Sequence, residues 1–190
     1  MILLIDTSSA SVATIGTIVD QTFSETFVPR GPVALAEAVK GYVKSGRLTK
    51  VAVASGPGSF TGLRVGVSVA LGIAMGLRVP IVPLPSLALQ AARTDDPVTA
   101  VGDAGRGRFY YLVPGGKPAL GEPTDIPTTF SLVGRVANHE APLLAAGHRF
   151  KPDNELRWLV GAAEILLRTA QEVPYRNLEI EYMQSFSAPS

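Results

Sequence analysis

Two aspartates, Asp6 and Asp103, each end a short apolar run and precede small residues that favour a tight turn. Thr7, Ser8 and Ser9 follow the first of them. An aspartate at a strand end can hold a metal-bound water, while neighbouring hydroxyls and backbone N–H groups contact a phosphate. The same residue types also build a hydrogen-bonded turn that closes a hairpin. Each aspartate therefore fits either an anion site or a plain turn.

A glycine-rich loop supplies the other part of a candidate anion site. The segment 55–66 reads SGPGSFTGLRVG and opens into an apolar helix. Backbone N–H groups at a helix start suit anions, and a turn with Ser59 or Thr61 as the N-cap explains the loop equally well. The loop lacks the Gly-Lys-Ser/Thr ending of a P-loop, so it has no lysine to reach a phosphate. The candidate anion site consists of Asp6, Thr7, Ser8, Gly58, Ser59 and Asp103.

The remaining residue types exclude several chemistries. The chain has no cysteine, which excludes disulfides, thiolate metal sites and cysteine nucleophiles. His139 and His148 stand nine residues apart without an HExxH pattern, so zinc peptidase chemistry has no support. A net charge of +1, from 17 basic and 16 acidic side chains, indicates no basic patch for nucleic acid. We predict neither a catalytic residue nor a metal site.

The helix after the glycine loop is apolar nearly all round. Only Arg64 and Ser68 are polar between Gly62 and Leu77, and the charge-free part is too short to span a membrane. A helix that lies on a sheet needs one apolar stripe, so either this helix is sandwiched inside its own domain or a partner protein covers its second face. Small residues that recur every four positions form one stripe along it, namely Gly62, Gly66, Ala70 and Ala74.

Apolar periodicity and turn residues predict an α/β chain. The expected helices cover residues 33–44, 62–77, 86–92 and 154–173. The expected strands cover residues 1–6, 12–20, 22–28, 51–54, 81–84, 98–101, 108–113 and 142–146, and residues 186–190 are expected to fray. Two strand–aspartate–turn units predict a duplicated fold with a cleft between lobes 1–94 and 95–190. Because the first residues form a strand without a basic segment, no signal peptide is expected, and a cytoplasmic location follows.

Three segments together resemble one protein family. They read LIDT at 4–7, ASGPGSFTGLRVG at 54–66 and DAGRGRFYY at 103–111. Over about residues 1–113 the chain resembles the TsaB (YeaZ) family of bacterial tRNA threonylcarbamoyladenosine biosynthesis proteins. The resemblance implies the actin-like fold of sugar kinases and the Hsp70 ATPase, built on a ribonuclease H-like motif. It also implies two lobes, of which the C-terminal one is shortened here.

The resemblance further implies a non-catalytic role beside TsaD. In this family, TsaD transfers the threonylcarbamoyl group to the adenosine next to the anticodon, and the ATPase TsaE joins the pair. The contact with TsaD uses the first two helices of the N-terminal lobe. The sequence leaves open whether the free protein forms a homodimer through the same helix. We expect tRNA to be reached only through the complex, and no membrane to be involved. The expected interface residues are Leu35, Val39, Tyr42, Gly62, Gly66, Ala70 and Ala74.

Nucleotide binding distinguishes the two functions that the sequence allows, a non-catalytic subunit and an ATP-dependent enzyme. Actin-like proteins need paired glycines near the last strand to approach an adenosine, and here the sequence reads AAG at 145–147. We therefore expect no cofactor of the chain's own, with ATP binding weak or absent. The alternative is a stand-alone ATP-dependent phosphotransferase or hydrolase of the same fold, which tight ATP binding would favour.

Overall fold

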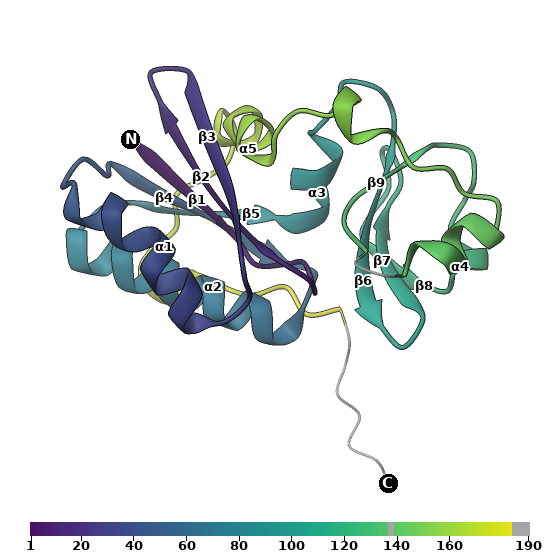
Figure 1. Ribbon diagram of the computed structural model, residues 1–190, viewed down its shortest axis with the longest axis horizontal. Coiled ribbons are helices and arrows are strands. Elements are labelled where there is room, and N and C mark those ends of the chain that lie inside the picture. Colours follow the sequence, from purple (N-terminus) through teal and green to yellow (C-terminus); the bar gives the residue numbers. More distant parts are fainter. Residues whose placement is uncertain (137–138, 184–190) are drawn as a thin grey trace, which may run out of the picture.

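Two β-sheets stand side by side and helices pack around them (Figure 1). The computed structural model describes residues 1–136 and 139–183. The larger sheet is built from the N-terminal half of the chain and the smaller from the residues that follow. This arrangement is consistent with the expected actin-like, ribonuclease H-like class, whereas the division into lobes 1–94 and 95–190 stays a prediction.

The first sheet has the strand order β3-β2-β1-β4-β5. β1 (Ile2–Asp6), β2 (Ala13–Val19) and β3 (Thr22–Val28) form an antiparallel meander. β4 (Lys50–Gly56) pairs in parallel with β1, and β5 (Ile81–Pro85) pairs in parallel with β4. Because β1 and β4 lie inside the sheet and are covered on both faces, their residues are apolar in continuous runs rather than in alternation.

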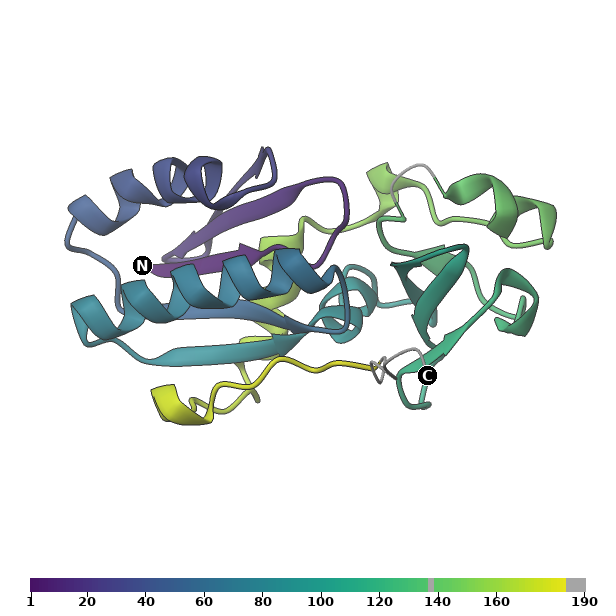
Figure 2. The same cartoon turned by 90° about the horizontal axis from the view of Figure 1, so that it is seen from below.

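Helices cover both faces of this sheet. α1 (Pro32–Lys44) and α2 (Phe60–Leu77) lie next to each other on one face, as Figure 2 shows from below. Alternate residues of β1 point to opposite sides, so Leu3 packs beneath those helices and Leu4 packs toward the other face. α3 (Ser86–Ala91) and α5 (Leu159–Leu167) contribute to the core on that second face.

The second sheet has the order β8-β7-β6-β9. β6 (Thr99–Gly105) and β7 (Arg108–Leu112) form its central hairpin, flanked by the short strands β8 (Ala119–Gly121) and β9 (Leu132–Val133). α4 (Glu140–Ala145) places Leu143 in a core with the fully buried Phe109. Three short 3-10 helices complete the described elements, at Pro123–Asp125, Asp153–Glu155 and Tyr175–Asn177.

Two of the predicted elements are wrong. Residues 142–146 were predicted as a strand, but the segment lies mostly in α4, where Pro142 occupies the first turn and costs no helical hydrogen bond. The predicted helix 154–173 shrinks to α5, because Arg157 N donates to Arg93 O and holds the chain extended before Leu159. After α5 the chain leaves the helix, and Val173 N donates to Ile81 O of β5.

The other expected helices and strands are confirmed, with ends that move by a few residues. α5 belongs to the second lobe by its sequence position, yet its residues Leu159 and Val160 are buried against the first sheet with Leu4 and Ile18. Residues 186–190, expected to fray, lie outside the described residues.

The small-residue stripe of α2 faces inward, which corrects its predicted position at a partner surface. Each of its four residues is buried. A Cβ on Gly62 would collide with the carbonyl oxygen of Thr7, and a Cβ on Gly66 with the Thr7 hydroxyl. Ala70 and Ala74 share a core with strands β1 and β4. The stripe therefore lets α2 approach the end of β1 in its own chain, and it is not available to a partner.

The C-terminal segment supplies part of the cover that the apolar helix requires. Tyr175 donates its hydroxyl to the backbone oxygens of Ala74 and Val79, and Glu181 N donates to Ser55 O. Figure 2 shows this segment running alongside the first sheet. By length and composition alone, α2 could cross a membrane, but here its inner face is packed against the sheet.

The close contact of α2 predicts opposite effects for two identical substitutions. Gly62→Ala should destabilise the protein by about 1–3 kcal/mol, because the new methyl group meets the Thr7 carbonyl. Gly72→Ala should stabilise it by about 0.5–1 kcal/mol, because alanine lowers the conformational entropy of the unfolded chain. Gly72 is exposed, and the new methyl group would meet open space. Urea denaturation of both variants measures this difference, and equal changes in stability would contradict the tight packing at Gly62.

Candidate functional site

The Asp6 turn and the glycine loop meet in the fold. Asp6 is buried, and its Oδ1 accepts a hydrogen bond from Ser8 N at 2.8 Å. Ser8 O in turn accepts from Ser59 N at 2.8 Å, and Gly58 packs so closely on Ser8 that a Cβ would stand 2.6 Å from the Ser8 oxygen. Five of the six predicted anion-site residues are therefore brought together.

The hydrogen bonds of this cluster are those of a turn and a helix cap. Ser59 Oγ accepts from Gly62 N at 3.3 Å, which makes Ser59 the N-cap of α2, as the sequence allowed. The same oxygen accepts from Arg30 Nη2 at 2.7 Å. Since Asp6 and Ser59 both serve the backbone, their side chains are occupied by folding. Thr7 is different, because its buried Oγ1 has no hydrogen-bond partner in the part of the chain that the structure describes.

Burial raises the pKa of Asp6, and this is the largest influence on the group. The hydrogen bonds from Ser8 oppose that shift, as does the positive charge of Arg135. Arg135 follows β9 in the second part of the fold, and its guanidinium lies 4.1 Å from the centre of the Phe27 ring on β3. One cation thus links the two sheets beside the buried carboxyl.

The sixth predicted residue, Asp103, forms a pair that sequence reasoning missed. Its Oδ1 accepts from Gly105 N at 2.7 Å, and its Oδ2 lies 2.7 Å from His139 Nδ1. The carboxylate side chain is 6 % exposed and the imidazole is 49 % exposed. A buried carboxylate that orients one ring nitrogen and leaves the imidazole open to solvent can support proton transfer. Asp103 and His139 are 36 positions apart, and no local sequence signal indicated this contact.

The cavity between the two sheets is small. This interlobe cavity measures 20 Å³ and is lined by Ser8 and Gly58 on one side and by Gly102 and Arg135 on the other. That volume is about enough for one water molecule. Gln90 also lines it, with a buried Oε1 that has no hydrogen-bond partner within residues 1–136 and 139–183. In this conformation the cavity has no room for a nucleotide.

A larger opening lies on the outer side of the first sheet. The α1–α2 groove, of 680 Å³, has walls built mainly from Val39, Val43, Val69, Gly72, Ile73 and Gly76. Lys40 and Lys44 stand at its edge with Glu37. Of the expected interface residues only Val39 lines this groove, whereas Leu35 is buried on the inner face of α1. The groove residues of α2 that the sequence reasoning missed lie on its second face, and they are Val69, Gly72, Ile73 and Gly76. The all-round apolarity of α2 could have indicated them.

Replacing the buried Asp6 carboxyl with an amide should stabilise the folded protein by an amount that depends on pH. A raised folded-state pKa means that Asp6 favours folding when protonated and opposes it as pH rises through that pKa. Asp6→Asn should therefore stabilise the protein at pH 7, since the amide can still accept from Ser8 N without a charge. The gain should shrink as the pH falls toward 4. Urea midpoints of both proteins from pH 4 to 8 measure it, and a destabilised variant at pH 7 would contradict this account.

Comparisons with known proteins indicate the family of this chain. A family model described as TsaD, tRNA N6-adenosine threonylcarbamoyltransferase, matches residues 6–151. An uncharacterized protein, ML0378 of Mycobacterium leprae, is 36 % identical over 123 residues, or 62 % of this chain and 33 % of that protein. The tRNA threonylcarbamoyladenosine biosynthesis protein TsaB of Bacillus subtilis is 42 % identical over 66 residues, or 33 % of this chain and 29 % of that protein. The matches thus span about a third of these curated relatives.

A solved structure shares the fold. YeaZ from Pseudomonas aeruginosa superposes with a TM-score of 0.71 at 18 % identity, and the alignment covers 96 % of this chain and 99 % of that one. The glycine loop and both aspartate turns lie within or at the start of the family match. Because that match extends over more than half of the chain and the related sequence and structure are TsaB and YeaZ, the chain belongs to the TsaB (YeaZ) family.

Proposed function

We propose that this protein is a non-catalytic subunit in the formation of threonylcarbamoyladenosine in tRNA. It would bind and activate a TsaD-type transferase, with the ATPase TsaE as a further component, and reach tRNA only through that complex in the cytoplasm. Family membership supports the pathway, since the TsaB relative is a tRNA threonylcarbamoyladenosine biosynthesis protein by name. The α1–α2 groove is the observation that carries the subunit role.

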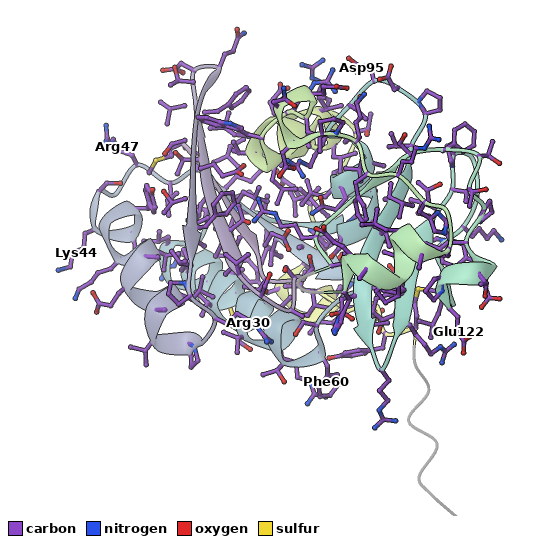
Figure 3. All side chains as sticks on the ribbon, turned by 45° about the vertical axis from the view of Figure 1, so that its right-hand side comes forward. Arg30, Lys44, Arg47, Phe60, Asp95 and Glu122 are labelled. Atoms are coloured by element: carbon purple, nitrogen blue, oxygen red, sulfur yellow. The ribbon has the colours of Figure 1, made fainter. Side chains whose placement is uncertain are left out.

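The groove has the composition of a protein-binding surface. Its walls are aliphatic, and Gly72 and Gly76 remove side chains from the outer face of α2. An exposed apolar surface between two helices, edged by charged residues, is typical of a helix-binding face. Lys44, at the end of α1, lines the groove, and Figure 3 shows Arg47 beyond that end of the helix. We infer that helices of the partner pack into this groove, and that a second copy of the chain can occupy it when the partner is absent.

The small size of the interlobe cavity supports the proposal that this chain binds no nucleotide of its own. It accommodates about one water, and the hydroxyl and carboxyl groups beside it are already bonded to the backbone. The AAG segment at 145–147, where paired glycines were sought, lies at the end of α4. The partner subunits would accordingly be the ones that bind and use ATP.

One observation favours the alternative function, a stand-alone ATP-dependent phosphotransferase or hydrolase. The Asp103–His139 pair has the arrangement of a carboxylate that orients a general base. For this pair to act, the two sheets would have to open and admit a nucleotide beside Asp6. The small volume of the interlobe cavity makes that function the second candidate.

A bulky cation in the α1–α2 groove should separate the complex without unfolding the chain. Gly72→Arg should weaken binding to the TsaD partner at least about tenfold, because a charged side chain would replace open space at a desolvated interface. Threonylcarbamoyl transfer by the reconstituted system should fall in proportion. Gly41→Arg is the matched control, since Gly41 is also an exposed helical glycine with open surroundings but does not line the groove. Equal binding by both variants would sink the docking proposal.

Calorimetric titration with ATP separates the two candidate functions. We expect weak binding or none by the isolated protein, because the interlobe cavity is too small and the glycine loop carries no lysine. A dissociation constant near 1 μM, equivalent to about −8 kcal/mol, would instead support the phosphotransferase or hydrolase. In that case His139→Asn should abolish turnover, and loss of turnover with unchanged ATP affinity would identify the Asp103–His139 pair as catalytic.

A further inference from the structure

A second cavity lies between the N-terminal ends of α1 and α2, and the functions discussed above make no use of it. This Arg30 cavity measures 340 Å³, within the range of small-molecule sites. Its residues come from both helices, from the turn after β1 and from the start of β2. Most of the wall is apolar and consists of Val12, Ala13, Pro32, Leu35 and Val65.

Of the described residues that line the cavity, only Arg30 is ionisable. Its Nη1 donates to Ala10 O at 2.8 Å and its Nη2 donates to Ser59 Oγ at 2.7 Å. A guanidinium has five N–H donors, so these two bonds leave three. Among the residues that the structure describes, no carboxylate forms an ion pair with Arg30. Two neutral acceptors hold the exposed side chain beside the first turn of α2 (Figure 3), so its charge is free to pair with an anion.

Backbone groups around the cavity have the same preference for negative charge. Gly31 is the N-cap of α1, and because glycine has no side chain it cannot cap the N–H groups of the first turn. The first helical bond runs from Leu35 N to Gly31 O. The positive end of α1 therefore adjoins the cavity without an acidic residue in its first turn. Thr7 also lines the cavity and is 6 % exposed, and its Oγ1 has no hydrogen-bond partner among the described residues.

We propose that the Arg30 cavity binds a small organic monocarboxylate. One guanidinium matches one negative charge, and its planar N–H groups suit a carboxylate. The aliphatic walls require an apolar body on the ligand, because a bare ion would leave them in contact with water. The positive end of α1 strengthens the same preference. This site is independent of the docking function proposed for the α1–α2 groove.

Hexanoate serves as the probe, and the isolated full chain serves as the protein. Saturation-transfer NMR and calorimetry should detect hexanoate binding, whereas 1-hexanol lacks the charge and acetate lacks the apolar body, so both should bind much more weakly. Arg30→Gln should weaken hexanoate binding about tenfold or more, through loss of a charge-assisted hydrogen bond. Arg106→Gln is the matched control, since Arg106 lies in the β6–β7 turn and does not line this cavity.

A second pair of variants tests the location of the site. Val65→Phe places a ring in the Arg30 cavity and should abolish hexanoate binding, whereas Val69→Phe lies one turn along α2 in the α1–α2 groove and should leave it intact. Circular dichroism checks that both variants are folded. Equal affinity for hexanoate and 1-hexanol, or an unchanged affinity in Arg30→Gln, would overturn the proposal. No hexanoate binding at all, with Arg30→Gln weakening the TsaD complex, would assign the cavity to a partner side chain and overturn it as well.

Discussion

The fold depends on the close approach of α2 to the end of β1. The carbonyl and hydroxyl of Thr7 occupy the space where side chains on Gly62 and Gly66 would lie, so only glycine fits these two positions without a shift. The contact fixes the rotation of α2 about its axis, because residues four apart share a face. It also sets the distance between the aspartate turn and the glycine loop, which the hydrogen bond from Ser59 N to Ser8 O then closes.

That rotation determines which residues remain on the outside. With the small-residue stripe against the sheet, the flank that carries Val69 and Ile73 turns toward α1, and Gly72 and Gly76 lie at the surface. The groove exists because α1 contacts the sheet through Leu35 and Val39 rather than through its outer residues. A helix that is apolar on every side thus has two separate uses: an inner face for its own sheet and an outer face that is open.

The order of elements could be predicted from the sequence, because strands buried on both faces and helices with a clear period carry their signals locally. The strand expected at residues 142–146 failed because a short apolar run fits a strand and a buried helical turn equally well. The rotation of α2 could not be predicted, since small residues every four positions suit a strand of the same chain and a partner helix alike. The contact of Asp103 with His139 depends on how the β9–α4 connection returns to β6, and no local pattern encodes that.

The distribution of unsatisfied groups separates the Asp6 turn and the glycine loop from the surfaces that remain open to ligands. A site that acts on a phosphate needs donors that folding leaves free, yet Asp6, Ser8 and Ser59 are all engaged with the backbone or with each other. The free donors and the open apolar area lie elsewhere, at Arg30 and along the α1–α2 groove. Arg30 links the two regions, because it holds Ser59 with one nitrogen and faces the cavity between the helix ends. A residue that stabilises the glycine loop therefore also supplies the cation of the Arg30 cavity.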